Sequence, residues 1–210
     1  MSDEDLERLM NMYLFNKHLF KSVDVDFTFE EVGMRIGPLL LIHVPGHCPG
    51  QIVIQADDIL FSSDHILGKT TPHQAPEQIT LNTGLGHYLE SLDKVMPLSS
   101  KVNLTLGGHE DPIPDLRIRI DEIKRHHEVR LAEILDHLNN PMTISELSYE
   151  LFHETEGYNE ILALQETGSH VEYLAQRGYL AVDNLDDMQP DVSVPIHYRY
   201  SDGVKPPRIT

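Results

Sequence analysis

The sequence predicts an α+β protein, because strand-like and helix-like patterns occupy different stretches of the chain. Short apolar runs separated by Gly, Pro and Asp lie between residues 23 and 64 and indicate strands. Stretches before and after them place apolar residues three and four positions apart, which indicates amphipathic helices. A length of 210 residues with 40% hydrophobic content is enough for a packed core.

Each element follows from its own pattern. Strands are expected at 27–32, 38–44, 51–55, 59–61 and 101–106. Helices are expected at 3–20 and 87–96, the second separated from the preceding strand by a proline-containing loop at 68–79. A long helix over 116–138 should begin after Asp115, whose carboxylate can cap its first turn.

The helix stop at Asn139-Asn140-Pro141 predicts a domain boundary. Residues 1–139 form the larger domain in this interpretation, 140–184 form a compact helical unit, and 185–210 form a tail. Because the tail is rich in proline and poor in apolar residues, it is either draped over the protein or partly disordered.

Charge and cysteine content narrow the classes of partner. The formal net charge is −18, which disfavours binding to DNA and to anionic membrane surfaces. A single cysteine, Cys48, permits no internal disulfide and fits a reducing compartment. The N-terminal residues do not resemble a signal peptide, and we therefore expect a cytoplasmic protein without a membrane span.

Three metal-capable side chains come directly after expected strands. His47 lies in the turn PGHCPG, Asp64 ends the run ILFSSD, and His109 follows a glycine pair. Each alone is most simply a loop or turn residue. Together, imidazole and carboxylate groups at strand ends are suited to a metal site.

In this order, the PGH loop, the Asp after a strand and the GGH loop resemble three motifs of the metallo-β-lactamase superfamily, in register over 27–138. The resemblance implies an αβ/βα sandwich with one or two metals, usually zinc and sometimes iron or manganese. It also implies that His47 holds the first metal, His109 holds the second, and Asp64 bridges them. A hydroxide held between the metals would be the nucleophile.

The family's principal motif, H-x-H-x-D-H, is absent from these 210 residues. Three ligands are too few for a dinuclear site, and we expect an incomplete site here. The chain is then a fragment or truncated product, a half that another polypeptide or a swapped copy completes, or a degenerate relative with a structural role. A half-sheet lacking its partner layer would favour a homodimer or complementation by an N-terminal half.

Other residues near these motifs are weaker candidates. His65, Lys69 and His73 lie where family members bind substrate. Cys48 could bind zinc, but packing as a small buried thiol is the simpler interpretation. The adjacent pair His126 and His127 cannot chelate one ion well, because neighbours on a helix point about 100° apart, so we assign them to the helix surface and packing.

The unit at 140–184 resembles the winged-helix-like module that follows the catalytic domain in one subgroup of the family. Arg177 is the only Lys or Arg in this unit, so we do not expect it to bind DNA. We expect the unit to pack against the larger domain or to cover the substrate as a lid. The resemblance therefore implies a metal-dependent hydrolase acting on a small-molecule ester, thioester or similar carbonyl compound. The alternatives are an RNA or phosphodiester hydrolase and an inactive scaffold or assembly protein.

Overall fold

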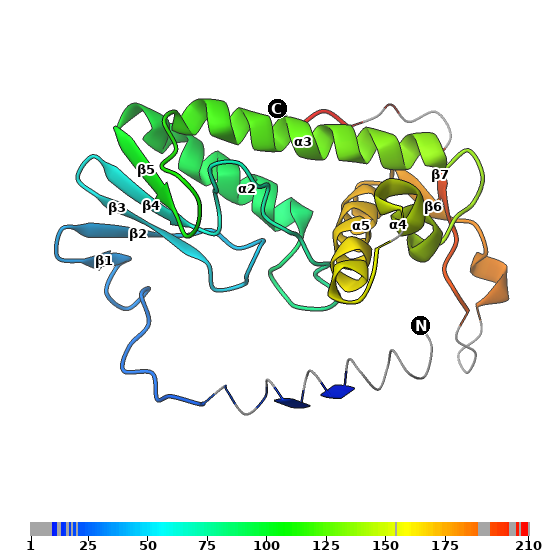
Figure 1. Cartoon of the computed structure of the whole chain (residues 1–210), viewed down its shortest axis with the longest axis horizontal. Coiled ribbons are helices and arrows are strands. Elements are labelled where there is room, and N and C mark those ends of the chain that lie inside the picture. Colours follow the sequence, from blue (N-terminus) through cyan, green and yellow to red (C-terminus); the bar gives the residue numbers. More distant parts are fainter. Residues whose placement is uncertain are drawn as a thin grey trace. The chain divides into compact units, whose positions relative to one another are not determined.

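The computed structural model describes residues 10, 11, 14, 15, 17, 19, 21–153, 155–188, 194–201, 205 and 207–209 (Figure 1). The chain divides into two compact units, Met1–Met34 and Arg35–Thr210. In the first unit, residues 10, 11, 14, 15 and 17 are helical, and most of the helix expected at 3–20 lies outside the described residues.

The strand expected at 27–32 is wrong, because residues 21–28 have no regular structure and 29–34 form turns. Thr28 and Glu31 explain the turn, since the Thr28 N–H donates to the Glu31 carboxylate at 2.7 Å. The Glu31 N–H donates back to the Thr28 hydroxyl at 3.4 Å. Such local side-chain bonds satisfy backbone groups that a strand would use in a sheet.

A five-stranded sheet forms the centre of the second unit, in the order β1-β2-β3-β4-β5. Neighbouring strands are antiparallel except β4 and β5, which are parallel. The strands expected at 38–44, 51–55, 59–61 and 101–106 are confirmed, and the short β1 was not expected. The strands are β1 (Arg35–Ile36), β2 (Leu39–His43), β3 (Ile52–Ala56), β4 (Ile59–Ser63) and β5 (Leu104–Gly107).

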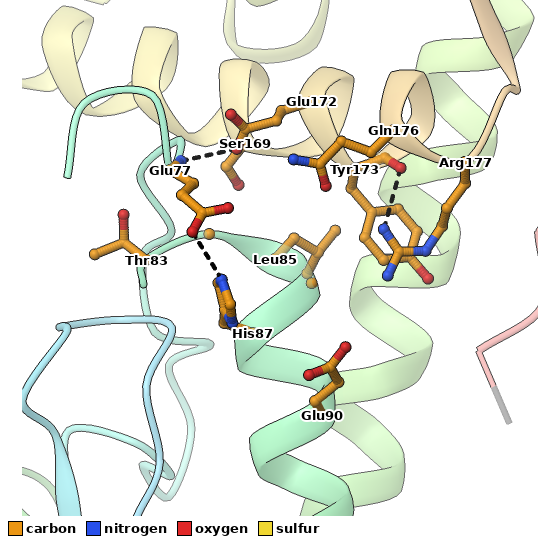
Figure 2. Close-up of a pocket in the computed structure, with 12 residues that line it drawn as sticks. Glu77, Thr83, Leu85, His87, Glu90, Ser169, Glu172, Tyr173, Gln176 and Arg177 are labelled. Carbon is orange, nitrogen blue, oxygen red and sulfur yellow. Dashed lines mark hydrogen bonds and ion pairs between the residues drawn. The ribbon is translucent and has the colours of Figure 1, made fainter. Parts of the chain in front are cut away.

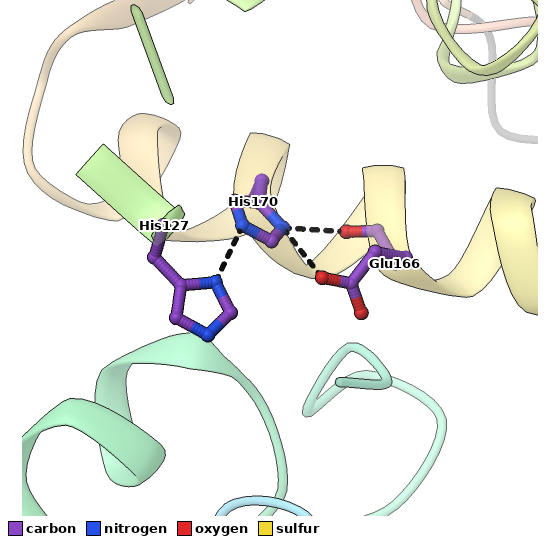
Figure 3. Close-up of side chains that lie close together, drawn as sticks. All are labelled: His127, Glu166 and His170. Atoms are coloured by element: carbon purple, nitrogen blue, oxygen red, sulfur yellow. Dashed lines mark hydrogen bonds and ion pairs between the residues drawn. The ribbon is translucent and has the colours of Figure 1, made fainter. Parts of the chain in front are cut away.

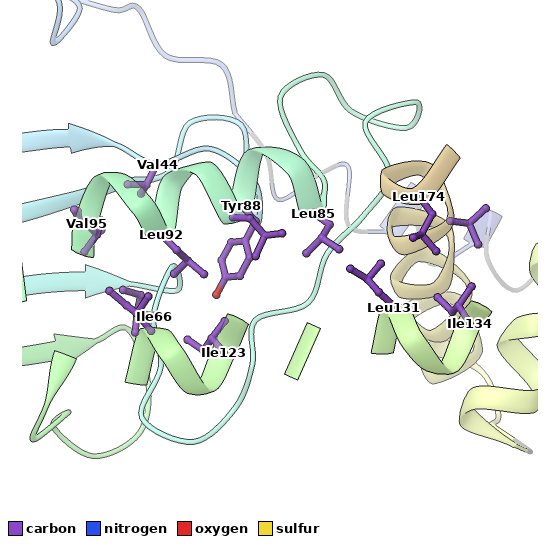
Figure 4. Packing of buried hydrophobic residues seen from close by; sticks show 14 of the residues in the cluster. Val44, Ile66, Leu85, Tyr88, Leu92, Val95, Ile123, Leu131, Ile134 and Leu174 are labelled. Atoms are coloured by element: carbon purple, nitrogen blue, oxygen red, sulfur yellow. The ribbon is translucent and has the colours of Figure 1, made fainter. Parts of the chain in front are cut away.

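Two long helices lie on one side of this sheet (Figure 1), α2 (Leu85–Val95) and α3 (Leu116–His137), with a short 3₁₀ helix η1 (Met96–Ser100) after α2. Asp115 caps α3 as expected, because its carboxylate accepts the Ile118 N–H at 2.9 Å. Val53 and Leu60 of the sheet join side chains of both helices in one buried cluster. Figure 4 shows part of this cluster, including Leu92 of α2 and Ile123 of α3. Burial of this apolar surface is what holds the helices against the sheet.

The opposite face of the sheet is also apolar, although it is partly exposed. Ile54 pairs with Phe61 on this face, and Ile59 pairs with Leu104. Phe61 is 43% exposed and Leu104 is 37% exposed, whereas Val53 and Leu60 on the helix side are fully buried. A sheet that is apolar on both faces is typical of a layer covered on both sides.

The C-terminal part contains α4 (Ile144–Phe152), α5 (Tyr158–Gln176), β6 (Leu180–Val182), a 3₁₀ turn η2 (Leu185–Asp187) and β7 (Tyr198–Tyr200). Thr143 and Glu146 form a reciprocal capping box that begins α4. β7 lies in the expected tail and pairs with β6, so this part of the tail is ordered. Leu131 of α3 and Leu174 of α5 share one buried cluster, and packing is therefore continuous across the turn at Asn140.

No helix in the described part of the chain is long and apolar enough to cross a bilayer.

Candidate functional site

His47, Asp64 and His109 all follow strands that end at the same edge of the sheet. β2 and β4 run in the same direction because both are antiparallel to β3, and β5 is parallel to β4. The carboxyl ends of these three strands therefore meet at one edge, where the sequence places the three side chains. Such an edge is where open α/β sheets commonly form their sites.

Asp64 and His109 are close enough to bind one ion. The His109 Nε2 atom lies 3.6 Å from Asp64 Oδ1. Two ligands bonded to one tetrahedral metal at about 2.1 Å would be about 3.4 Å apart. Gly108 makes this approach possible, because a Cβ atom at position 108 would collide with the Asp64 carboxylate.

The backbone on either side of this pair is strained. Ser63, directly before Asp64, has φ +53°, and Glu110, directly after His109, has φ +71°. A non-glycine residue in the left-handed region costs on the order of 1 kcal/mol or more, and such residues cluster at functional sites. The Glu110 carboxylate, in turn, accepts the Lys69 N–H at 2.6 Å, which holds the neighbouring loop.

His47 is held in one tautomer by the main chain. Its Nδ1 atom lies 2.7 Å from the carbonyl oxygen of His73. A carbonyl can only accept, so Nδ1 carries a proton, and in the neutral ring Nε2 then has the free lone pair. This is the usual arrangement of a metal-binding histidine, whose second nitrogen donates to a carbonyl or carboxylate.

The loop before His47 is fixed by close packing on α2. A Cβ atom at Gly46, which has φ +138°, would lie 2.5 Å from the Cα of Tyr88. The Ser91 hydroxyl donates to the Pro45 carbonyl at 2.7 Å. The His47 side chain therefore starts from a backbone that has little room to move.

Cys48 is exposed, and the expectation that it packs as a buried thiol is wrong. It lies in a bend between Pro45 and Pro49. Partial burial raises the pKa of the thiol, and the negative charge of Asp64 raises it further. Both effects favour the neutral thiol over the thiolate that binds zinc.

The three expected substrate-loop residues have different surroundings. The Lys69 side chain is 79% exposed and forms a surface ion pair with Asp111 at 3.5 Å. His73 is half-buried, and its Nε2 atom donates to the Leu162 carbonyl at 3.1 Å. His65 is fully buried against the ring of Tyr88, which is the position of a core residue.

A second set of metal-capable groups lies between α3 and α5, away from the expected motifs (Figure 3). In the described part of the chain, one group of three ligand atoms lies within 4.8 Å, that of His127, Glu166 and His170. The edge residues His47, Asp64 and His109 are less tightly grouped. No short-range pattern in the sequence indicates the whole set, because 43 residues separate His127 from His170. The one local signal was the four-residue spacing of Glu166 and His170, which places them on one helix face.

Hydrogen bonds already account for the arrangement of this buried set. His170 Nδ1 donates to the Glu166 carbonyl at 2.7 Å, so its Nε2 accepts from His127 Nδ1 at 3.0 Å. A metal would have to displace the proton between the two rings. Burial lowers the pKa of His170 to about 3 and that of His127 well below its ordinary value, and the positive charge of Arg130 contributes to both shifts. The same charge would oppose a bound cation.

A hollow of about 190 Å³ lies between α2 and α5 (Figure 2). Its polar wall includes the hydrogen bond between His87 Nε2 and the Glu77 carboxylate at 3.0 Å. Arg177, at the C-terminal end of α5, stacks over the ring of Tyr173 at 3.7 Å. None of the expected metal ligands lines this hollow.

No protein-family model and no curated protein matches the sequence. Among solved structures, the chain is similar to a metallo-beta-lactamase family protein from Thermus thermophilus, with 29% identity and a TM-score of 0.61 over 78% of this chain and 49% of that one. It is also similar to a beta-lactamase domain protein from Burkholderia ambifaria, with 24% identity and a TM-score of 0.68 over 78% of this chain and 48% of that one. The chain therefore spans about half the length of these proteins.

Proposed function

We propose that this chain, which has the metallo-β-lactamase superfamily fold, contributes half of the site of a metal-dependent hydrolase. The observation that carries the proposal is the meeting of His47, Asp64 and His109 at one edge of the sheet. The 3.6 Å separation of Asp64 and His109 fits two ligands of one ion. His47, Asp64 and His109 would hold a divalent metal, with zinc as our first choice, and that metal would supply the Lewis acidity that polarises a carbonyl and activates water near neutral pH.

The roles of the chain's own residues follow from their contacts. His47 presents an unprotonated Nε2 atom, because its Nδ1–H is held by the His73 carbonyl. Asp64 provides the negative charge at the edge, and His109 provides a second imidazole that is 72% exposed and accessible to a ligand. The strained backbone at Ser63 and Glu110 fixes the positions from which the last two side chains start.

We propose an ester, thioester or similar small carbonyl compound as the substrate. A phosphodiester or RNA is the second choice, because the same metal chemistry serves phosphorus, but a net charge of −18 would repel a polyanion. An inactive scaffold is the candidate outside enzymes. The feature that favours it is the small number of ligands, since three donors are fewer than two ions need.

The partner that we propose is a second β-sheet carrying further histidine and carboxylate ligands. Two features support it, the shortage of ligands at the edge and the apolar face that bears Phe61 and Leu104. Exposed apolar side chains in a row on one face mark a surface that another layer covers. Either another polypeptide segment or a second copy of this chain could provide that layer. Light scattering of the purified chain, alone and with a candidate partner, distinguishes the two.

Metal content of the purified chain, measured by mass spectrometry, tests the proposal. The variant His47→Ala/Asp64→Asn/His109→Ala removes the edge ligands, and Asn keeps the packing against Gly108. The matched control His127→Gln/His170→Gln removes the buried set. Metal that is lost from the first variant and kept in the control would support the edge site and justify a screen of esters and thioesters. Metal lost only from the control would place the ion in the helical cluster and contradict the proposal, and absence of metal from all three, with and without the partner, would favour the scaffold.

A further inference from the structure

Helix α5 holds the loop that leads from the sheet edge to α2. The Leu162 carbonyl accepts from the His73 ring at 3.1 Å, and the Glu166 carboxylate accepts the Gln74 N–H at 2.7 Å. Further along the helix, the Glu172 carboxylate accepts the Glu77 N–H at 2.8 Å. These contacts attach the loop to α5 at three successive points.

The fit between helix and loop is close as well as polar. A Cβ atom at Gly168 would lie 2.9 Å from the Pro76 ring, so the helix backbone approaches the loop directly at this position. Glu166 is largely buried, with its side chain 15% exposed. A buried carboxylate that accepts a backbone N–H is strongly favoured to keep that bond, because losing it would leave a buried group without a partner.

The same loop controls His47. The His73 carbonyl accepts the His47 Nδ1–H at 2.7 Å, while the His73 ring donates to α5. His73 therefore connects α5 with the imidazole at the sheet edge through two hydrogen bonds on one residue. Gln74, the next residue, is held by Glu166, which limits rotation of the peptide between them.

We propose that His73 and Glu166 are positioning residues, through which helix α5 fixes the tautomer and orientation of His47. This role rests on the proposed function, because its expected consequence is a higher metal affinity at the sheet edge. The proposal assigns to α5 a role that needs no contact between this helix and the substrate. Outer hydrogen-bond partners of metal-binding histidines typically change metal affinity by about 10- to 100-fold.

The primary measurement is the tautomer of His47 in the metal-free full chain, read from long-range ¹H–¹⁵N correlation spectra of its ring. In the wild type we expect the proton on Nδ1, as the bond to a carbonyl requires. In His73→Ala and in Glu166→Ala we expect a mixture of tautomers, because the carbonyl is no longer fixed. His73→Gln keeps a side-chain N–H donor, and Glu166→Gln keeps an oxygen acceptor for Gln74, so both should restore much of the wild-type spectrum.

The second measurement is the affinity for Zn²⁺ alone, by calorimetric titration of the same proteins. We expect His73→Ala and Glu166→Ala to bind about 10- to 100-fold more weakly at the edge, and the two conservative variants to stay within about threefold of the wild type. Glu160→Ala, at an exposed position of α5, is the control for substitution in this helix. Thermal unfolding of each variant identifies any that fails to fold, and the conservative pair then carries the comparison.

The measured outcomes separate the positioning role of His73 and Glu166 from the proposed metal site itself. A His47 tautomer and a Zn²⁺ affinity that do not change in either alanine variant would overturn the positioning role and leave the metal site intact. A wild type that binds no Zn²⁺ either alone or with the partner, but whose His47 tautomer still responds to substitutions on α5, would contradict the proposed function and support the connection. A wild-type His47 with its proton on Nε2 would refute the connection directly.

Discussion

Acidification from pH 7 to pH 5 should destabilise the fold through its buried histidines. Burial lowers the pKa of His65 and of His170 to about 3, from an ordinary value of 6.5. The nearby Ser91 backbone offsets part of the lowered pKa of His65, because it favours the protonated ring. In the described part of the chain, both ring nitrogens of His65 are nevertheless buried without a hydrogen-bond partner. These rings stay neutral in the folded chain at pH 5, whereas they become protonated in the unfolded chain. Protonation of these residues in the unfolded chain therefore lowers the free energy of unfolding as the pH falls through 6.5, and this loss is absent at pH 7.

Glu166 acts in the opposite direction. Burial raises the pKa of its carboxyl from 4.5 to about 7, so the folded chain binds its proton more tightly than the unfolded chain does. Between pH 7 and pH 5 the group regains about 2 kcal/mol of stability, while each buried histidine loses about 2 kcal/mol. With two or three such histidines, depending on how far His127 contributes, the net loss is about 2–4 kcal/mol.

Urea unfolding followed by circular dichroism at pH 7, 6 and 5 measures this loss. The variant His65→Leu removes one of the titrating rings, and we expect it to reduce the loss by about 2 kcal/mol. His137→Gln, at an exposed position of α3, is the matched control for the loss of a histidine that is not buried. Stability that is constant or rises from pH 7 to pH 5 in the wild type would refute the reasoning, and so would a His65→Leu variant with the full loss.

Three further predictions concern packing and caps. Gly46→Ala places a Cβ atom 2.5 Å from the Tyr88 backbone and should cost about 3 kcal/mol in urea unfolding; a wild-type midpoint would contradict the close packing. Gly108→Ala forces the Asp64 carboxylate away, and we expect at least about tenfold weaker Zn²⁺ binding by calorimetry, more than any loss of stability explains; equal affinity would remove Asp64 from the site. Thr143→Ala removes the capping box of α4 and should cost about 1 kcal/mol in thermal unfolding without changing metal content.

The sequence predicted the elements whose signals are local. The long helix α3 was expected because Asp115 can cap it and its apolar residues recur at helical spacing, and the structure shows both features. β2, β3 and β4 were expected from short apolar runs separated by turn residues. The strand at 27–32 failed because Thr28 and Glu31 bond to each other's backbone, a local competition that apolar periodicity does not report.

Features that depend on tertiary contacts could not be predicted from the sequence. The edge residues could be found because each one follows a strand, and the sheet topology then brings the strand ends together. The pairing of His127 with His170 depends on how α3 packs against α5, which no short-range pattern encodes. β7 was missed for the same reason, since its three residues are stabilised as a strand by pairing with β6.

Our proposal of a site that a partner completes, rather than one that has lost its function, draws on the geometry of the sheet edge. A scaffold with no ligand to hold would gain stability by relaxing the backbone at Ser63 and Glu110, whose left-handed conformations cost on the order of 1 kcal/mol each. It would have no need for the space that Gly108 leaves for Asp64, or for the fixed tautomer of His47. The apolar face behind the same strands adds an exposed surface that a free-standing scaffold would be expected to replace with polar residues. All of these costs are offset at once if a second sheet covers that face and brings the remaining ligands to this edge.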